Sequence, residues 1–242
     1  MNSPPRILVG VCTYNEVVNV DPMVDRLRRA LPEADILVVD DNSPDGTADA
    51  VRSIAASDDQ VQLIVRTDER GLGGAIVRAM TAAVDGDYDL FVNLDGDLSH
   101  DPAQIPSLIQ AAISDPTIDV VVGSRYIPGG QIVGWPLRRR IMSRFVNRFA
   151  TSCLRLPIND CSGSMRCYRV ATLRQLDLQT LQCTGYALLE ELLVRVHRDG
   201  GKLAEVPITF TERQDGHSKL TLGEAIRSMS FMVRLAVRVP KK

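Results

Sequence analysis

Long apolar runs are missing from this sequence of 242 residues, and their absence excludes one class of protein. No stretch approaches the roughly 20 consecutive apolar residues that a helix needs to cross a bilayer. The N-terminus also lacks the pattern of a signal peptide, because the apolar stretch behind it ends within a few residues. We therefore expect a protein that is soluble or rests on a membrane surface, and that does not cross it.

Paired cysteines and a strong charge imbalance are missing as well. The five cysteines show no Cys-x-x-Cys spacing, so neither a zinc site nor a disulfide framework is indicated, and the set suits a reducing cytosol. A formal net charge of -2 gives no general drive toward nucleic acid, and we expect no nucleic-acid partner. Internal repeats and low-complexity linkers are also absent, so we expect residues 1–242 to form a single domain.

The first half of the sequence alternates strand and helix patterns. Strands are predicted at residues 7–12, 36–39, 61–65, 88–94 and 119–123. Helices are predicted between them at residues 21–31, 47–56, 75–84 and 102–113. Asp21 is expected to cap the first helix, with Pro22 at its first position. This alternation predicts an α/β fold with a mostly parallel sheet flanked by helices.

The second half is less regular. Helices are predicted at residues 138–156, 186–198 and 222–239, and a strand at residues 202–210. Pro207 interrupts that strand, which favours an edge position or a bulge. The first and last of these helices are amphipathic, with arginines beside an apolar stripe, which suits contact with an anionic lipid surface. A helix that faces the core and exposes a basic face to water is the alternative.

The most informative motif is Asp95-Gly96-Asp97, directly behind the apolar run at residues 90–94. That run predicts a buried strand, and open α/β sheets bind ligands at the carboxyl ends of their strands. Mg²⁺ and Mn²⁺ prefer oxygen ligands, usually one or two carboxylates completed by substrate phosphates. Two carboxylates separated by a glycine can therefore hold a metal that carries a diphosphate, whereas an isolated Asp-x-Asp pair is more often a solvated loop.

Two further segments bear on nucleotide binding. Residues 71–74, Gly-Leu-Gly-Gly, lack the third glycine of a dinucleotide fingerprint, and no Gly-Lys-Ser/Thr follows them. They predict a tight turn into a helix, with room for a ligand near the backbone. Asp41 ends the second strand, where its carboxylate can accept paired donors from a nucleobase edge. Asp40 and Asp45 can do the same, or can organise the turn through side-chain hydrogen bonds.

Taken together, the motifs resemble those of a known enzyme family. They comprise residues 11–16, 40–47, 95–100, 123–126, 134–139, 160–166, 185–186, 205–208 and 216–219. The sequence resembles family 2 inverting glycosyltransferases with a GT-A (Rossmann-like) fold, and among them the dolichol-phosphate (polyprenol-phosphate) mannose synthases. The resemblance spans about residues 6 to 235. The early motifs indicate only the superfamily, whereas the later ones point to the synthases.

The resemblance implies roles for particular residues. Those that it assigns to the nucleotide sugar are Cys12, Tyr14, Glu16, Val39, Asp41, Asp95, Gly96, Asp97, Arg213 and Lys219. Asp95 and Asp97 would hold Mg²⁺ or Mn²⁺, and Arg125 and Arg139 would hold an acceptor phosphate. The implied catalytic residues are Asp97, Arg125, Arg139, Arg213 and Lys219. About residues 6–125 would then bind the nucleotide sugar, and about residues 126–242 the acceptor.

The implied activity is metal-dependent transfer of mannose, with inversion, from GDP-mannose to a polyprenyl (dolichyl-type) monophosphate. A phosphate monoester is already anionic at neutral pH, so it needs orientation more than a dedicated general base. The enzyme would lie peripherally on the cytoplasmic face of a membrane, held by the lipid surface or by a membrane-protein partner.

Other readings stay open. The same fold can use UDP-glucose or another nucleotide sugar, with polyprenyl phosphate or a glycan as acceptor. A sugar hydroxyl would need a carboxylate base, for which Asp160 and Glu191 are candidates, although both suit structural hydrogen bonds equally. A nucleotide-binding scaffold without turnover is a third reading. Cys12, Gly96, Met165 and the Leu189-Glu190 pair depart from the usual family residues, and the last affects the acceptor or sugar pocket.

Overall fold

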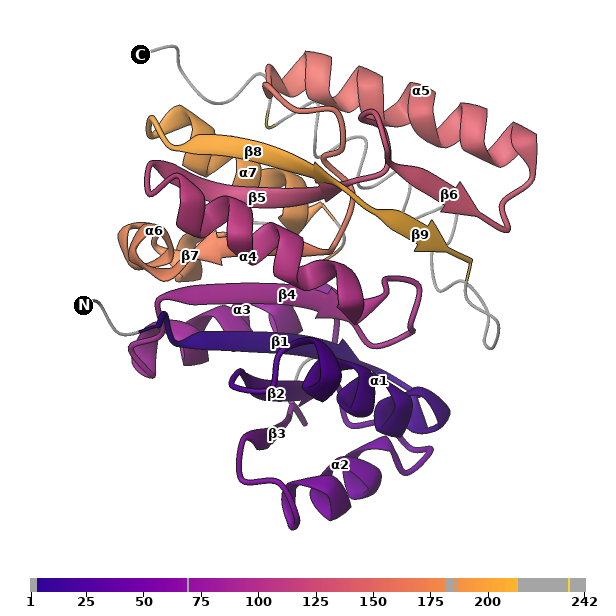
Figure 1. Ribbon diagram of the computed structural model, residues 1–242, viewed down its shortest axis with the longest axis vertical. Coiled ribbons are helices and arrows are strands. Elements are labelled where there is room, and N and C mark those ends of the chain that lie inside the picture. The colour runs from indigo at the N-terminus through magenta and orange to yellow at the C-terminus, as the bar shows by residue number, and fades with distance from the viewer. Residues whose placement is uncertain (1–3, 69, 182–184, 186, 213–234, 236–242) are drawn as a thin grey trace.

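A mixed sheet forms the centre of the molecule (Figure 1). The computed structural model describes residues 4–68, 70–181, 185, 187–212 and 235. The main sheet has seven strands in the order β3-β2-β1-β4-β7-β5-β8, and β6 pairs with β9 in a second sheet. The strands are β1 (Ile7–Thr13), β2 (Asp35–Asp40), β3 (Val61–Val65), β4 (Leu90–Asp95), β5 (Ile118–Ser124), β6 (Gln131–Val133), β7 (Arg166–Arg169), β8 (Lys202–Pro207) and β9 (Thr209–Thr211). The predicted α/β class is confirmed.

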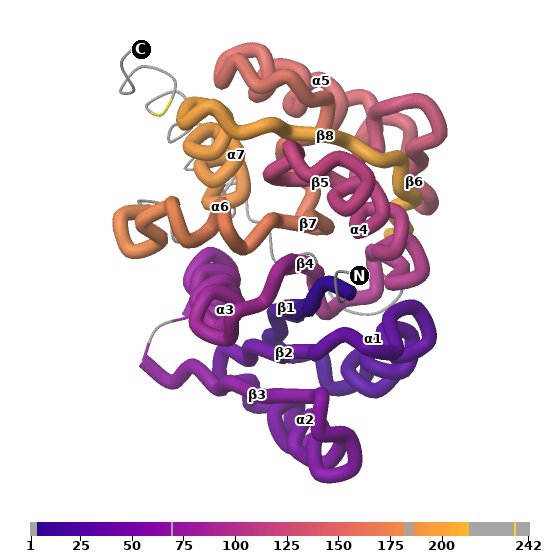
Figure 2. The backbone as a smooth tube through the Cα atoms, turned by 60° about the vertical axis from the view of Figure 1, so that its left-hand side comes forward, coloured from indigo at the N-terminus to yellow at the C-terminus, as the bar shows by residue number. Residues whose placement is uncertain are grey.

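Helices cover both faces of the main sheet (Figures 1 and 2). They are α1 (Val17–Ala30), α2 (Thr47–Ala55), α3 (Leu72–Asp85), α4 (Ile105–Ser114), α5 (Leu137–Leu154), α6 (Val170–Gln175) and α7 (Leu188–Arg198), with 3₁₀ turns η1 (Pro102–Gln104) and η2 (Leu178–Thr180). Alternate residues of the strands enter different cores: Leu8 and Leu37 pack with α3, α6 and α7, whereas Val9 and Ile36 pack with α1, α2 and α4. Period-two alternation in the strands therefore produces two apolar layers.

The structure corrects the predicted start of α1. The helix begins at Val17, so Asp21 and Pro22 lie inside it and the predicted cap is wrong. The start is fixed by the neighbouring loop, because Asp45 Oδ2 accepts a hydrogen bond from Val17 N at 3.1 Å. Pro22 has no N–H to donate to the carbonyl of Val18, so one hydrogen bond of the helix is missing. Val18 is 66% exposed. Water can reach that carbonyl, so the helix tolerates the proline.

The region predicted as one strand at residues 202–210 forms two. β8 is the edge strand of the main sheet, as Pro207 indicates, and it pairs with β5 in parallel. The chain then enters the second sheet, where β9 pairs with β6. The sequence patterns also missed β7, a strand of four residues that lies antiparallel between β4 and β5.

The strand order reverses at β1, which pairs with β2 on one side and β4 on the other. Open α/β sheets bind ligands at the carboxyl ends of strands beside such a switch point. In register, Cys12 pairs with Asp95 of β4, and Thr13 pairs with Asp40 of β2. The pairing thus brings Asp40 and Asp95 close together at the carboxyl ends of the central strands.

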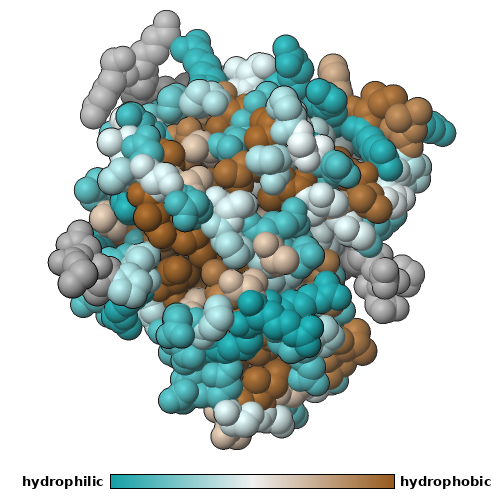
Figure 3. Space-filling model, in the orientation of Figure 1, coloured by the Kyte–Doolittle hydropathy of each residue, from teal (hydrophilic) through white to brown (hydrophobic). Residues whose placement is uncertain are grey.

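Helix α5 lies at the periphery, and only its C-terminal part enters a core, through Ala150 and Leu154 (Figure 1). Its exposed apolar side chains are Leu137, Ile141, Met142, Phe145 and Phe149. Figure 3 shows apolar residues gathered at the upper right, over this helix. Within the described ranges, no helix is both long and apolar enough to cross a membrane. The helix predicted at 222–239 lies outside the described residues, apart from position 235.

Candidate active site

The loops that follow β1 and β2 hold each other at the switch point. The Asn15 backbone N–H donates to Ser43 Oγ at 2.9 Å, and the Glu16 N–H donates to Thr47 Oγ1 at 3.0 Å. Asn15 adopts a left-handed conformation with φ of 55°, which asparagine tolerates better than most residues. The two loops therefore form one unit, which fixes where Tyr14 and Glu16 stand.

Asp40 and Asp45 organise the turn between β2 and α2. Asp40 accepts hydrogen bonds from Thr13 Oγ1 at 2.9 Å and from Ser43 N at 2.8 Å, while Asp45 caps Thr47 N at 3.0 Å. Burial alone would raise the pKa of Asp45, but the hydrogen bonds from Thr47 outweigh it and lower that pKa. Of the two roles considered for these residues, turn organisation is the one that the contacts support.

Asp41 is the buried anchor of the glycine-rich segment. Its carboxylate accepts from Arg66 Nη1 at 2.5 Å and from the Gly71 backbone N–H at 2.6 Å. Gly71 begins α3 with a φ of 135°, a conformation that strongly favours glycine. A Cβ at Gly74 would lie 2.3 Å from Arg66 Nη2, so the guanidinium packs directly against this glycine. Asp41 thus positions this loop beside the switch point.

Tyr14 is partnered by an arginine that the sequence patterns did not single out. The Arg70 guanidinium lies 5.3 Å from the centre of the Tyr14 ring and donates to its hydroxyl at 3.2 Å. Arg70 also reaches the carbonyl of Asn42 at 3.4 Å. Arg70 thus places a positive charge beside the loops where a nucleotide is expected.

The two aspartates of the central motif stand at the end of β4. Ser164 Oγ donates to Asp95 Oδ2 at 2.6 Å, and the Ser99 backbone N–H donates to Asp97 Oδ1 at 3.0 Å. Groups of three or more metal-binding side chains are absent from the described ranges. A cation here would take carboxylate oxygens from the pair and complete its shell with phosphate oxygens and water, as Mg²⁺ usually does. The donor set fits such a cation.

The backbone of this motif presses against β1. The Gly96 N–H donates to the carbonyl of Cys12 at 3.2 Å, and a Cβ at Gly96 would lie 2.8 Å from Thr13 Cγ2. Burial and the nearby negative charges of Asp95 and Asp41 raise the pKa of the Cys12 thiol, so the thiol stays protonated. Val39 pairs with Cys12 in the sheet, and its side chain is buried.

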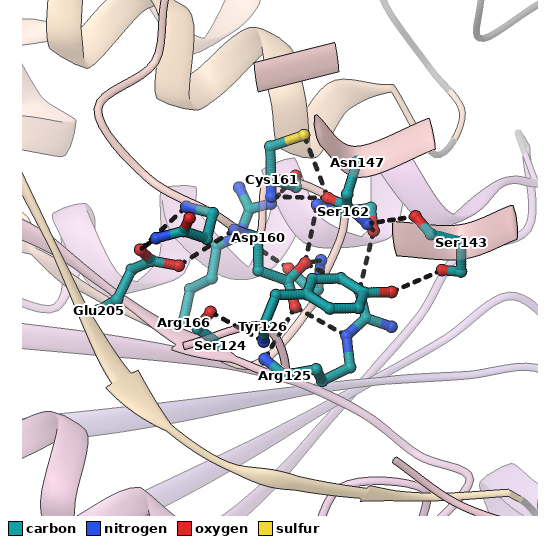
Figure 4. Close-up of polar contacts among 12 residues, drawn as sticks. Ser124, Arg125, Tyr126, Ser143, Asn147, Asp160, Cys161, Ser162, Arg166 and Glu205 are labelled. Atoms are coloured by element: carbon teal, nitrogen blue, oxygen red, sulfur yellow. Dashed lines mark hydrogen bonds and ion pairs between the residues drawn. The ribbon is translucent and has the colours of Figure 1, made fainter. Parts of the chain in front are cut away.

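Arg125, just behind β5, is fixed by a buried ion pair (Figure 4). Its Nε and Nη2 atoms donate to the two oxygens of Asp160 at 2.7 and 2.8 Å, and Nη2 also donates to Ser162 Oγ at 2.9 Å. Burial alone would lower the pKa of Arg125, but the charge and hydrogen bonds of Asp160 outweigh it and raise that pKa. Among the described contacts Nη1 has no hydrogen-bond acceptor, so this edge of the guanidinium is available for an anion.

An aromatic cluster connects the loop of Asp97 with both predicted acceptor arginines. Phe210 of β9 packs edge-on against His100 at 5.1 Å and against Trp135 at 5.3 Å between ring centres. The Arg125 guanidinium lies 5.5 Å from the Phe210 ring, and that of Arg139 lies 4.0 Å from the Trp135 ring. Phe210 therefore links Arg125 and the loop of Asp97 directly, and Arg139 through Trp135.

His100 lies between the acidic and basic parts of this cluster. Burial and the charge of Arg125 lower its pKa to about 4, against the opposing influence of Asp97 and Asp160. Neither ring nitrogen has a hydrogen-bond partner among the described residues. The imidazole is thus neutral at physiological pH and serves mainly as an aromatic contact for Phe210.

The candidate general bases are held by arginines. Asp160 pairs with Arg125, and Glu191 accepts from Arg195 at 2.7 Å. Glu190 is the buried carboxyl that sequence reasoning did not consider as a base, and burial raises its pKa to about 7 despite the nearby Arg166. The sequence did offer one signal for Glu190, because the Leu189-Glu190 pair departs from the usual residues of the family.

Several predicted residues have partners that only the fold reveals. Arg139 donates to Glu212 Oε1 at 2.5 Å across the end of β9. Arg66, Arg70 and Phe210 were missed, because nothing in their local sequence indicates which loops they contact. Arg213 and Lys219 lie outside the described residues.

Comparison with known proteins identifies the family. A family model described as glycosyl transferase family 2 matches residues 8–177. An undecaprenyl-phosphate mannosyltransferase from Micrococcus luteus is 41% identical over 224 residues, which is 91% of each chain. A polyprenol monophosphomannose synthase from Mycolicibacterium smegmatis is 38% identical over 229 residues, which is 94% of this chain and 85% of that protein.

Solved structures share the fold at lower identity. Glucosyl-3-phosphoglycerate synthase from Mycobacterium tuberculosis matches with a TM-score of 0.70 and 18% identity, over 98% of this chain and 82% of that one. The complex of that enzyme with Mn²⁺, UDP and glucosyl-3-phosphoglycerate gives a TM-score of 0.66 at 18% identity, over 96% of this chain and 79% of that one. This likeness confirms the GT-A-like architecture. From the family match and the two relatives that span most of its length, the chain belongs to glycosyltransferase family 2 and is a glycosyltransferase.

Proposed function

We propose that this enzyme transfers mannose, with inversion, from GDP-mannose to a polyprenyl monophosphate. The two curated relatives support the mannosyl and polyprenyl parts, because both names contain them and each alignment covers at least 91% of this chain. The observation that carries the proposal is the cluster around Phe210, where the loop of Asp97 meets Arg125 and Arg139. A donor diphosphate and an acceptor phosphate would thus bind in one site, formed by about residues 6–125 and 126–242 respectively.

Asp95 and Asp97 would hold Mg²⁺ or Mn²⁺ against the donor diphosphate. When bound, the cation supplies the positive charge that stabilises the departing nucleoside diphosphate. The protein's own part is orientation, since Ser164 and the Ser99 N–H fix one oxygen of each carboxylate. We further propose that Arg213 and Lys219 add positive charge.

At the nucleotide end, we propose that Tyr14, Glu16 and Asp41 contact the donor, with Cys12, Val39 and Gly96 forming the floor of that site. The hydrogen bonds between the loops after β1 and β2 support this placement. Arg70, beside Tyr14, adds a cation that suits an anionic nucleotide.

The acceptor's chemistry removes the need for a general base. A phosphate monoester with a second pKa of about 6 is an anion at neutral pH, so orientation by arginines suffices. Arg125 fits this role because Asp160 fixes two of its nitrogens and leaves Nη1 for a ligand. The ion pairs of Asp160 and Glu191 support structural rather than basic roles for both carboxylates.

A lipid acceptor also requires contact with a membrane. We propose that α5 supplies it, because this helix exposes Phe145 and Phe149 next to Arg144 and Arg148. Such a helix lies in the interface between headgroups and acyl chains. The enzyme would then rest on the cytoplasmic face, either alone or with a membrane-protein partner.

A donor and acceptor assay tests the proposal. The full chain is incubated with Mg²⁺, a polyprenyl monophosphate and either labelled GDP-mannose or labelled UDP-glucose, and label in the chloroform phase is measured. Label from GDP-mannose alone, dependent on the lipid phosphate, is expected. If label is extracted only after incubation with UDP-glucose, the donor is UDP-glucose and not GDP-mannose. No extractable label, but labelled water-soluble glycan, would replace the acceptor.

A further inference from the structure

A second group of arginines, separate from Arg125 and Arg139, surrounds a cavity beneath the C-terminal half of α5. The cavity has a volume of about 440 Å³. Its walls come from α5, from Tyr126, and from the loop that follows the helix, and they include Arg144, Arg148, Arg155 and Asn159. That volume accommodates a phosphate together with the group that carries it.

The positive charge at this cavity is not balanced. Arg144, Arg148 and Arg155 form no ion pair with any described residue. Burial and the neighbouring charge of Arg155 lower the pKa of Arg198, so Arg155 repels a second arginine close to the cavity. Arginine forms charge-assisted hydrogen bonds with phosphate oxygens, so a phosphate would relieve this repulsion.

The cavity adjoins the proposed acceptor site, because the Arg125 guanidinium lies 5.3 Å from the ring of Tyr126 in its wall, but different arginines line it. The nearest cavity arginine on this helix, Arg144, stands five residues after Arg139, which corresponds to about 7–8 Å along the helix. Neither Arg125 nor Arg139 lines this cavity: Arg139 pairs with Glu212 beside Trp135, and Arg125 pairs with Asp160 through Nε and Nη2. Tyr126, whose hydroxyl is 2.7 Å from Ser143 Oγ, ties the cavity wall to α5.

The same helix carries an apolar ridge beside the cavity. Phe145 and Phe149 are 68% and 45% exposed, and each follows an arginine of the cavity by one residue. Helical geometry therefore places the two aromatic rings on a face next to the guanidinium groups. A ligand with a phosphate joined to an apolar chain matches this arrangement better than a water-soluble anion does.

We propose that this cavity binds the headgroup phosphate of an anionic phospholipid, whose chains lie along the apolar ridge of α5. The lipid is neither donor nor acceptor, and the site depends on the proposed function only in using the same membrane-facing helix. It would fix the enzyme's orientation on the membrane and leave Arg125 and Arg139 for the acceptor.

Vesicle binding tests the proposal without any sugar donor or polyprenyl phosphate. The full chain is sedimented with phosphatidylcholine vesicles that contain or lack phosphatidylglycerol. The double variant Arg144→Gln/Arg148→Gln is compared with Arg138→Gln/Arg140→Gln, which removes the same charge from the same helix outside the cavity. Circular dichroism checks that both variants fold. Because no transfer reaction is measured, the result is independent of the donor and acceptor assignments.

The control variant is expected to lose about thirtyfold in affinity for anionic vesicles, from about fivefold for each arginine near an anionic surface. The cavity variant should lose about tenfold more than the control, because it also loses charge-assisted hydrogen bonds to the headgroup phosphate. Equal losses would show that diffuse charge explains the binding and would overturn a defined site. Unchanged binding by the cavity variant would overturn it as well.

A second measurement separates lipid from soluble phosphate. Inorganic phosphate is expected to release wild-type protein from anionic vesicles more effectively than sodium chloride of equal ionic strength. Equal release by both salts would contradict phosphate recognition. If titration calorimetry shows phosphate binding that the cavity variant loses, while both variants bind vesicles alike, the ligand is a soluble phosphate compound and the lipid assignment is wrong.

Discussion

At the proposed donor end of the candidate site, several carboxylates bind hydroxyl and N–H groups within their own loops: Asp40 binds Ser43 three residues later, and Asp45 and Asp97 each bind an N–H two residues later. Asp41 and Asp95 are exceptions, because they bind Arg66 and Ser164 in distant segments. At the acceptor end, the contacts join distant segments. Arg125 pairs with Asp160, 35 residues later, and Arg139 pairs with Glu212, 73 residues later. The proposed acceptor end therefore depends on ion pairs between distant segments, and the loss of one partner leaves the other charge without its counter-charge. At the donor end, by contrast, Asp97 is held by a local turn.

This difference predicts which substitutions separate activity from stability. Removing the charge of Asp97 should mainly affect chemistry, because the local turn around it is retained. Removing a carboxylate at the acceptor end should affect folding too, because an arginine then loses its counter-charge.

The largest effect is expected for Asp97→Asn. The amide keeps the size of the side chain and can still accept from the Ser99 N–H, but it removes the charge that a divalent cation requires. Activity should fall by about 10³-fold or more under saturating Mg²⁺ or Mn²⁺, on the scale of losing a dominant electrostatic interaction in a transition state. Steady-state transfer assays measure the loss, and thermal unfolding should be nearly unchanged.

Asp101→Asn is the matched control. Asp101 lies four residues later on an exposed position and caps Ala103 N at 3.1 Å, a bond that asparagine can also accept. This variant should retain nearly full activity. Near-normal activity of Asp97→Asn would show that the metal assignment is wrong.

The next effect concerns stability at the acceptor end. Asp160→Asn leaves the buried Arg125 guanidinium without its counter-charge, which should lower the free energy of unfolding by about 3–5 kcal/mol. Urea denaturation followed by circular dichroism measures the change. Asp49→Asn, which breaks the exposed pair with Arg52, should change the stability by less than about 1 kcal/mol. Similar losses in both variants would contradict the contrast between the two kinds of ion pair.

Glu190 gives the acceptor half a pH dependence. Its pKa is raised from 4.5 to about 7, so the folded state retains a proton that the unfolded state loses. Protonated Glu190 therefore contributes to the free energy of unfolding fully below about pH 4.5, and this contribution is lost as the pH rises toward 7. The loss is at most about 3 kcal/mol. Glu190→Gln should remove this component and be more stable than wild type at pH 8.

Unfolding curves of both proteins between pH 4.5 and 8 provide the measurement. Only the difference between them isolates Glu190, because other groups titrate in the same range. Glu33→Gln, at an exposed position, should follow the wild-type profile. A constant difference across this pH range would rule out titration of Glu190 as its cause.

The sequence predicted the features that depend on local pattern. Short apolar runs located β1 to β5, and the motif at residues 95–97 was correctly expected at a strand end. The start of α1 was missed because Asp45, from another loop, caps it. β7 was missed because two of its four residues are arginines, Arg166 and Arg169, whose burial depends on backbone carbonyls in distant segments. Its antiparallel placement likewise depends on tertiary pairing.

The same limit applies within the site. Asp95 and Asp97 could be assigned from their spacing, since both follow one strand. Phe210 could not, because a phenylalanine in a strand usually indicates packing only. Its contacts with His100 and Trp135 arise from the crossing of β9 into the second sheet. Residues that connect two halves of a site are thus visible only after both halves are placed.

The smallest effect is expected at Arg139, and it sharpens the contrast within the acceptor end itself. Unlike Arg125, Arg139 is 46% exposed in its side chain and pairs with a half-exposed Glu212. Arg139→Ala should therefore leave the unfolding free energy within about 1 kcal/mol of wild type. It should raise the KM for polyprenyl phosphate by about tenfold, the effect of losing one exposed charge-assisted contact of about 1.4 kcal/mol.

The split between kinetic constants distinguishes this role from a structural one. Because Arg139 would contact the acceptor and not the donor, the KM for GDP-mannose should stay within about twofold, as for the neighbouring control Arg138→Ala. Arg139→Lys should restore only part of the acceptor affinity, since an ammonium group cannot stack on Trp135 and bind phosphate in the planar geometry of a guanidinium. Equal changes in the KM for donor and acceptor would mean that Arg139 has a structural role, through its contacts with Trp135 and Glu212. The acceptor phosphate would then be bound elsewhere.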